Sequence, residues 1–361
     1  MKKSKKILIS PLNWGLGHAS RIVPVIRGLI ELGHDVKIGG SGNSIDYLKA
    51  YFDDSMFLLI NSPLIRYGKK QAIGPGFAFS FYGFIKGILR DRRALKKLCK
   101  KYNFDVVISD NRPGLYSKKI LSIYITHQYN VLTRKPKSLS GRLVRFAHHK
   151  MLLRFDYCLI PDTHGALSLA GILSRAEQNN KNLFVGVLSR FAELKFISEP
   201  TDANKTDVLI LFSGPEPQRS QFEQIILNKF EFTDNRVAIV RGVVNGIPVA
   251  NEFSNNIQVY NNPTDIVLFQ LIKTASLIIC RSGYSSLMDL AACQRKAVLV
   301  PTPGQPEQEY LAKLFESKFG FVVCEQNRIT ELQLENVKLD DSWDYPYDID
   351  KLKNVLDLCL K

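Results

Sequence analysis

The sequence predicts an α/β protein made of two domains, each a doubly wound sheet of parallel strands covered by helices. The chain has 361 residues, and domains usually run to roughly 150–200 residues. Its composition of 45% hydrophobic and 23% charged residues is sufficient for full cores. Short apolar runs alternate with helical patterns in both halves, and this alternation is typical of parallel sheets.

The first half alternates strand and helix from its start. Residues 6–10 form a short apolar run that predicts a strand, and residues 19–32 carry apolar side chains at helical spacing. Gly33 stands where a C-cap glycine is expected, and residues 34–38 predict the next strand. Further along we expect two strands and a helix between them, at residues 105–109, 122–126 and 115–121.

The second half repeats this plan after a polar segment. Residues 198–206 have no apolar periodicity and are the expected linker. We therefore expect one domain over residues 1–196, a second over 207–348, and a C-terminal helix over 349–361 that packs back on the N-terminal domain or its neighbour. Strands are expected in the second domain at residues 207–212, 237–241, 257–260, 276–280, 297–300 and 320–323.

Several protein classes are excluded or disfavoured. No apolar stretch approaches the roughly 18–20 residues needed to span a bilayer. The basic start of the chain is followed by only three apolar residues, too few for an export signal. We therefore expect a cytoplasmic protein. The cysteines form no CxxC pair of the kind that binds zinc or carries redox chemistry: Cys99, Cys158, Cys280, Cys293, Cys324 and Cys359.

The positive charge is concentrated in the first half of the chain. Residues 1–195 hold 33 basic and 12 acidic side chains, a net charge of +21, whereas residues 196–361 hold 16 and 22, a net charge of −6. Such an asymmetry indicates that the first half meets an anionic partner: nucleic acid, a membrane surface or a phosphorylated substrate. The alternative is that the lysines serve only solubility.

The loop after the first strand is a candidate functional loop, because ligands of doubly wound sheets bind beyond the carboxyl ends of the strands. Gly15 and Gly17 allow a tight turn, and His18 stands at the start of the next helix. A histidine there can act as a general base, since its pKa lies near neutrality. Alternatively, His18 is a surface residue that caps the helix. The third glycine of a dinucleotide fingerprint and a P-loop lysine are both missing.

A second candidate loop follows the strand that ends at Cys280. Arg281, Ser282 and Gly283 make the expected turn into a helix, whose free N–H groups can bind a phosphate or diphosphate. Asp289 lies two helical turns further on, where a carboxylate can accept hydrogen bonds from ribose hydroxyls. The alternative is that the turn only caps the helix and that Asp289 is solvated.

A proline-rich loop over residues 300–310 ends in amides and acids. Gln305, Gln308 and Glu309 offer paired donors and acceptors for the hydroxyls of a sugar.

Taken together, the motifs at residues 15–18, 281–289 and 303–308 make the chain resemble the glycosyltransferases of family 28. The best-known member of that family adds N-acetylglucosamine to lipid I. Residues 17–21 and 108–111 also resemble a set of related, poorly characterised transferases. The resemblance implies the GT-B fold: two Rossmann-like domains with a cleft between them, the acceptor in the first and the nucleotide sugar mainly in the second. It further implies a metal-independent and typically inverting reaction.

On the donor side, the resemblance assigns roles to five residues of this sequence. Ser282 and Gly283 match the diphosphate-binding turn, and Asp289 matches the acid that holds the ribose. Gln308 and Glu309 match the pair that reads the donor sugar.

On the acceptor side, His18 matches the position proposed as the base or as a cleft contact to the donor. Ser213 and Gly214 are two further residues of the nucleotide-sugar side and match the glycine-rich loop after the first strand of the second domain. Two loops depart from the family pattern: the first has Asn13 and Trp14 in place of a glycine pair, and the loop after Phe212 contains proline in place of a run of glycines.

Two polar residues follow other strands of the first domain. Asp110 is expected to orient His18, as the acid does in plant-type GT-B enzymes, or else to cap a helix. His127 follows the strand at residues 122–126 and is a second candidate for the cleft.

The basic half contains segments typical of a membrane-touching protein. Residues 77–101 place aromatic side chains before a run of cations, and residues 134–154 add basic side chains with apolar ones at helical spacing. Several cations near an anionic leaflet contribute on the order of 1 kcal/mol each. The alternative is that the aromatic residues are core and the cations a solvated helix end.

Three functional classes follow. The first is a glycosyltransferase that uses a nucleotide sugar, expected to be a UDP-sugar, on a lipid-linked or cell-envelope acceptor, with no cofactor or metal and with peripheral attachment to the inner face of the membrane. The second is a nucleotide-sugar epimerase or hydrolase on the same fold. The third is a non-catalytic basic binding protein, which is disfavoured because the sequence holds no nucleic-acid-binding motif.

Overall fold

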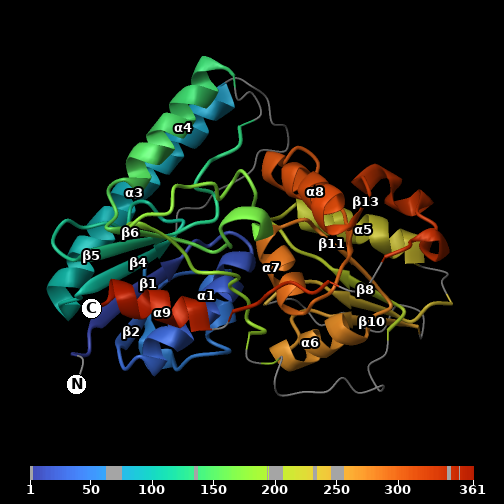
Figure 1. The fold of residues 1–361 in the computed structure, drawn as a ribbon, viewed down its shortest axis with the longest axis horizontal. Coiled ribbons are helices and arrows are strands. Elements are labelled where there is room, and N and C mark those ends of the chain that lie inside the picture. Colours follow the sequence, from blue (N-terminus) through green and yellow to red (C-terminus); the bar gives the residue numbers. More distant parts are fainter. Residues whose placement is uncertain are drawn as a thin grey trace.

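The computed structural model describes residues 3–61, 75–133, 137–192, 194, 206–230, 234–244, 256–339, 343–348 and 350–361. Within these ranges the chain forms two sheets of parallel strands, each flanked by helices (Figure 1). The predicted fold class is therefore confirmed. The expected linker lies outside the described residues except for its last residue, Thr206.

The N-terminal sheet has seven strands in the order β3-β2-β1-β4-β5-β6-β7. Its strand order reverses at β1, which lies between β2 and β4, so a crevice opens at the carboxyl ends of β1 and β4. The strands are β1 (Lys6–Pro11), β2 (Asp35–Gly40), β3 (Phe57–Leu59), β4 (Val106–Asp110), β5 (Leu121–Ile125), β6 (Tyr157–Ile160) and β7 (Asn182–Phe184). The helices are α1 (Gly17–Glu31), α2 (Asn43–Leu48), α3 (Pro75–Tyr102) and α4 (Leu139–Leu152).

The predicted helix at residues 115–121 is wrong. Residues 111–120 connect β4 to β5 without a helix, and the connection lies directly on α3. A Cβ atom at Gly114 would lie 2.6 Å from the carbonyl oxygen of Ile88, and the Arg112 guanidinium is 2.7 Å from the carboxylate of Asp91. These contacts with α3 hold the segment in turns and irregular structure in place of the helix that its local sequence favours.

The C-terminal sheet has six strands in the order β10-β9-β8-β11-β12-β13. Here the order reverses at β8, so the loops after β8 and β11 face the crevice of this domain. The strands are β8 (Val208–Leu211), β9 (Val237–Val240), β10 (Ile257–Tyr260), β11 (Leu277–Cys280), β12 (Val298–Leu299) and β13 (Val322–Val323). The helices are α5 (Gln218–Phe230), α6 (Asp265–Thr274), α7 (Tyr284–Ala292) and α8 (Pro306–Phe319).

The two domains pack against each other through helices that start at these crevices. Helix α1 of the first domain contacts α7 of the second, and one hydrophobic cluster includes Ile22 and Leu287 from these helices. The last helix, α9 (Asp350–Cys359), returns to the first domain and lies beside α1 (Figure 1). Leu356 of α9 is fully buried, and Lys353 forms an ion pair of 2.8 Å with Glu31. The chain therefore crosses between the domains twice.

Candidate functional site

His18 and Asp110 form a buried pair at the crevice of the N-terminal sheet. Helix α1 begins at Gly17, so His18 lies in its first turn, and Asp110 is the last residue of β4. Pro11 at the end of β1 pairs in register with Asp110, which brings the start of α1 beside the carboxyl end of β4. The His18 Nδ1 atom lies 2.7 Å from Oδ2 of Asp110. Asp110 thus occupies the orienting position that we expected, and no helix follows it to be capped.

Arg21 is a third member of this buried group, and it was not predicted as a site residue. It lies one turn after His18, on the same face of α1, and its side chain is only 1% exposed. Its Nε donates to Oδ1 of Asp110 at 3.0 Å, a second bond runs from Nη2 to the same oxygen, and Nη1 lies 3.0 Å from Nδ1 of His127. The i, i+3 spacing from His18 was the sequence signal available for it.

These neighbours define the protonation state of the pair. Burial alone would raise the pKa of Asp110, but the charges of Arg21 and His18 outweigh it and lower that pKa. Asp110 is therefore a carboxylate, to which His18 donates its Nδ1 proton. Burial, reinforced by the Arg21 charge, lowers the pKa of His18. His18 is thus neutral near pH 7 with its Nε2 lone pair free, as a general base requires.

His127 links this cluster to the C-terminal domain. Its Nε2 lies 2.7 Å from Oε1 of Glu307, in the first turn of α8, and the amide of Gln128 donates to the other carboxylate oxygen. The His127 ring stacks on Tyr284 of α7, with centroids 4.3 Å apart and planes at 12°. His127 therefore lies between the domains, where it was expected as a candidate for the cleft. Glu307 was not predicted as a site residue, because only the fold brings it next to His127.

Three glycine-containing loops converge beside this cluster, one after each of β1, β8 and β11. A Cβ atom at Gly15 would lie 4.0 Å from the main chain of Gly214, and one at Gly283 would lie 4.0 Å from Oγ of Ser213. Gly15 and Gly214 have φ angles of +65° and +100°, which favour glycine. The structure thus brings together four residues predicted from separate motifs. Exposed main-chain N–H groups in such loops suit an anionic ligand.

Gly17 forms a direct bridge between the domains at the same place. Its main-chain carbonyl accepts a hydrogen bond of 2.9 Å from the hydroxyl of Ser285, in the first turn of α7. A Cβ atom at Gly17 would lie 2.9 Å from that hydroxyl oxygen, so the contact requires a glycine. The first N–H groups of α7, which have no partner within the helix, begin at this contact.

Two residues of the predicted diphosphate turn have other roles in the structure. Arg281 is buried, donates to the main-chain carbonyl of Val300 at 3.1 Å and to the Gln326 side chain at 2.6 Å, and stacks over Phe222 at 3.9 Å. Ser282 is also buried and donates to the carbonyl of Gln308 at 2.8 Å. Both side chains hold loops of the C-terminal domain together, and diphosphate binding by the main chain of this turn stays a prediction.

The predicted sugar-reading residues form a small hydrogen-bonded group at the start of α8. Gln308 accepts a bond of 2.9 Å from the main-chain N–H of Thr302, and its amide donates to Gln305 at 2.9 Å. Glu309 is exposed and accepts from the N–H of Gly304 at 2.7 Å. Their role in reading a donor sugar stays a prediction.

Asp289 lies at the domain interface. Its carboxylate accepts a bond of 2.7 Å from the Ser189 hydroxyl and lies 3.4 Å from Nε of Arg190. Burial raises the pKa of Asp289 to about 6, although Arg190 opposes that rise. Arg190 also lies 3.6 Å from Asp265 of α6 and donates to Tyr47 of α2. The contact of Asp289 with a ribose stays a prediction. In this structure its carboxylate forms a hydrogen bond with Ser189 and an ion pair with Arg190, both of the N-terminal domain.

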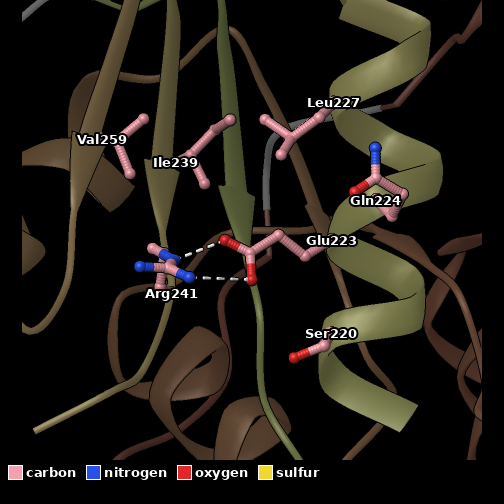
Figure 2. A pocket seen from close by; sticks show the side chains of 7 residues that line it. All are labelled: Ser220, Glu223, Gln224, Leu227, Ile239, Arg241 and Val259. Carbon is pink, nitrogen blue, oxygen red and sulfur yellow. Dashed lines mark hydrogen bonds and ion pairs between the residues drawn. The ribbon is translucent and has the colours of Figure 1, made fainter. Parts of the chain in front are cut away.

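A separate pocket of about 280 Å³ lies between α5 and strands β9 and β10 (Figure 2). Glu223 and Arg241 form an ion pair at its side, so its two charges are matched to each other. No residue predicted for the site lines it: its lining is Ser220, Glu223, Gln224, Leu227, Ile239, Arg241 and Val259. The candidate site is therefore the interdomain cluster and not this pocket.

Solved structures share this two-domain architecture. The glycosyltransferase SnogD from Streptomyces nogalater superposes with a TM-score of 0.59 at 15% identity, over 99% of this chain and 94% of that one. The UDP-GlcNAc 2-epimerase of Methanocaldococcus jannaschii superposes with a TM-score of 0.60 at 12% identity, over 99% and 100%. The fold is therefore GT-B, with the candidate site between its two domains.

Sequence comparisons add the family. Residues 219–343 match the model of the glycosyltransferase family 28 C-terminal domain. An uncharacterized glycosyltransferase of Methanosarcina mazei is 23% identical over 87% of this chain and 84% of its own. The UDP-N-acetylglucosamine–N-acetylmuramyl-(pentapeptide) pyrophosphoryl-undecaprenol N-acetylglucosamine transferase of Prochlorococcus marinus is 24% identical over 70% and 67%. These matches support a glycosyltransferase of the family 28-like, GT-B class, as the resemblance inferred from the motifs implied.

Proposed function

We propose that this glycosyltransferase moves a sugar from a UDP-sugar to a hydroxyl group of a lipid-linked, cell-envelope acceptor, with inversion and without a metal ion. The observation that carries the proposal is the buried pair of His18 and Asp110, which leaves Nε2 of His18 free beside the convergent glycine loops. A base next to an anion-binding cradle is what a direct displacement of a nucleoside diphosphate requires.

In the proposed reaction, Nε2 of His18 takes the proton of the acceptor hydroxyl while its oxygen attacks the anomeric carbon. The bond from that carbon to the diphosphate oxygen breaks on the opposite face, and UDP leaves with the electron pair. The Asp110 carboxylate stabilises the imidazolium that forms on His18. The N-terminus of α7 and the loops at Gly214 and Gly283 face the charge that develops on the leaving diphosphate.

The names of similar proteins support a uridine nucleotide. The transferase of Prochlorococcus marinus is named for UDP-N-acetylglucosamine, and the structural neighbour from Methanocaldococcus jannaschii was solved with UDP-GlcNAc and UDP. A UDP-sugar is therefore the donor class to test before others.

A lipid-linked acceptor is supported by the surface of α4. Helices α3 and α4 lie side by side and project from the N-terminal domain (Figure 1). Leu139, Leu143 and Phe146 of α4 are 84%, 65% and 60% exposed and follow one another at i, i+4 and i+7. Arg142 and Lys150 are exposed on the same helix. An apolar stripe with cations beside it matches an anionic lipid surface, and we propose that α4 docks on one.

The position of α4 changes which cations matter for this docking. Lys96, Lys97, Lys100 and Lys101, the run expected to contact a membrane, are exposed in the last two turns of α3. They lie on the order of 30 Å along α3 from its first residue, which is at the projecting end (Figure 1). We therefore place the lipid contact at α4. None of the helices in the described ranges has the length and hydropathy needed to cross a membrane.

Transfer is distinguished from the alternatives by its dependence on an acceptor. The fold likeness to a UDP-GlcNAc 2-epimerase keeps an epimerase or hydrolase as the second candidate. Calorimetry with UDP, followed by incubation with UDP-sugars with and without a membrane lipid extract, separates the two. We expect UDP to bind and to be released from a UDP-sugar only with the extract. Turnover at the same rate without acceptor would favour an epimerase or hydrolase, and absence of uridine nucleotide binding would exclude both.

A further inference from the structure

A continuous chain of hydrogen bonds connects the C-terminal domain to the proposed base. Glu307 contacts Nε2 of His127 at 2.7 Å, and Nδ1 of His127 lies 3.0 Å from Nη1 of Arg21. Arg21 in turn holds Oδ1 of Asp110, whose Oδ2 lies 2.7 Å from His18. Four of these side chains belong to the N-terminal domain and are at most 9% exposed; only Glu307 comes from the other domain.

The direction of each bond follows from the chemistry of its donors. Nδ1 of His127 faces Nη1 of Arg21, which can only donate, so the neutral ring accepts there. The remaining ring proton is then on Nε2 and points at Glu307. Nδ1 of His18 also lies 2.9 Å from Nη2 of Arg21, but it faces the acceptor-only carboxylate of Asp110 at 2.7 Å and donates to that carboxylate.

Gln128 donates to the second oxygen of Glu307. Each oxygen of the Glu307 carboxylate therefore accepts one hydrogen bond. Burial alone would raise the pKa of Glu307, but its hydrogen bond with His127 and, beyond it, the charge of Arg21 lower that pKa.

The charges of these hydrogen-bonded side chains sum to zero only after His18 has taken a proton. With both histidines neutral, Arg21 carries one positive charge against the negative charges of Asp110 and Glu307. When His18 becomes an imidazolium, two positive charges face two carboxylates. Without Glu307 the same protonation would leave a net positive charge in a buried site, which is unfavourable.

We propose that Glu307 is a positioning residue through which the C-terminal domain sets the strength of the base: it contacts His127 across the domain interface, and its charge raises the proton affinity of His18. The inference rests on the proposed role of His18 as the base. The charged or titratable groups that face His18 are Arg21 on α1, Asp110 at the end of β4 and His127 after β5. Tyr284 of α7, stacked on His127, has a pKa far above neutrality because it is buried.

The direct test is an NMR titration of the protein labelled with ¹⁵N-histidine. We expect Glu307→Gln to lower the pKa of His18 by about 0.5 to 1 unit, the effect of removing one nearby charge in a partly solvated protein site. Glu316→Gln, an exposed carboxylate on the same helix, is the matched control and should leave that pKa unchanged. Glu307→Asp, which keeps the charge, should recover part of the shift.

Kinetics supply a readout that a merely structural role would not change. In Glu307→Gln the acid limb of the pH profile of kcat/KM should move to lower pH and kcat should fall, while the KM for the donor stays within twofold. An unchanged pKa of His18 in a folded Glu307→Gln protein would overturn the inference. The titration needs no turnover, so its result is independent of whether the chain transfers a sugar.

Discussion

The Nδ1 atom of His18 lies 2.7 Å from Oδ2 of Asp110, although 92 positions separate the two residues in the sequence. They meet because β1 and β4 are neighbours in the sheet and Pro11 pairs with Asp110 in register. Asp110 is fully buried, and Arg21 holds its other oxygen. The carboxylate is therefore fixed in place before any ligand binds, and it fixes the tautomer of His18.

Replacement of Asp110 by asparagine should affect catalysis more than binding. The amide no longer enforces the Nδ1–H tautomer of His18 and cannot balance an imidazolium, so kcat should fall by about 10²–10⁴. UDP affinity measured by calorimetry should remain within about threefold. Asp105→Asn is the control, because Asp105 directly precedes β4, at the end of the strand away from Asp110, and accepts from the Lys6 N–H at 2.8 Å. Equal rates for wild type and Asp110→Asn would contradict the assignment.

Replacement of Arg21 by methionine should destabilise the protein. It leaves the buried carboxylate of Asp110 without its cation, and removal of one partner from a buried ion pair costs about 3–5 kcal/mol. Arg27→Met, on a half-buried position of the same helix, should cost under about 1 kcal/mol. Urea unfolding at pH 7 measures both changes.

The pH dependence of the Arg21→Met effect has a defined sign. Because the folded-state pKa of Asp110 is lowered, its ionisation stabilises the folded state above the unfolded pKa and this stabilisation is lost as pH falls. Loss of the Arg21 charge also raises the pKa of Asp110 in the variant. The difference between wild type and Arg21→Met should therefore be largest near neutral pH and should shrink as pH falls and Asp110 of the variant takes up its proton. A cost that is the same for Arg21→Met and Arg27→Met would show that no buried pair has been broken.

Asp289 should make stability depend on pH in the opposite direction. Burial raises its pKa to about 6, above the value of about 3.9 for an unfolded chain. Its contribution to stability is then fully present below about pH 4 and is lost as pH rises through about 6. Wild type should therefore lose stability relative to Asp289→Asn between pH 4 and 6.5, with a constant difference above pH 7. Urea unfolding across this pH range measures the free energy of unfolding of both proteins. A difference between them that does not depend on pH would be inconsistent with a raised pKa of Asp289.

The α4 surface should carry the affinity for anionic lipid. We expect the double change Leu143→Glu with Phe146→Glu to reduce binding to vesicles of anionic phospholipid at least about tenfold, since it places two like charges on the apolar stripe. Ile266→Glu, an exposed apolar position on α6 of the other domain, is the control. Neutralising Lys96, Lys97, Lys100 and Lys101 should have the smaller effect. A larger loss from the lysine changes than from the α4 changes would place the lipid contact on α3.

The elements that the sequence predicted are those whose signal is local. The strands at residues 6–10 and 207–212 are buried parallel strands, and these appear as continuous apolar runs. Strands β3 and β7 have three residues each and leave too short a pattern to detect. The helix predicted at residues 115–121 is wrong because the irregular path of this segment depends on contacts with α3, which local sequence does not record.

The same limit applies to the site. His18 and the glycine loops were predicted because each belongs to a short motif at the end of a strand. Arg21 and Glu307 stand in the motifs at residues 17–21 and 303–308, but they act through contacts with His127, which is 106 and 180 positions away from them. Only the fold shows those contacts. Arg281 stands in a motif, but whether its side chain faces the crevice or the interior is decided by its tertiary contacts.

The central claim, that this chain is a transferase with His18 as its base, is tested most directly by acceptor-dependent release of UDP. Wild type and His18→Ala would be compared on a panel of UDP-sugars with a membrane lipid extract, with UDP binding measured in parallel and His34→Ala as control. We predict release by wild type only when the extract is present, a rate at least about 100-fold lower for His18→Ala, and equal UDP affinity for both. Release by His18→Ala at the wild-type rate would contradict the account.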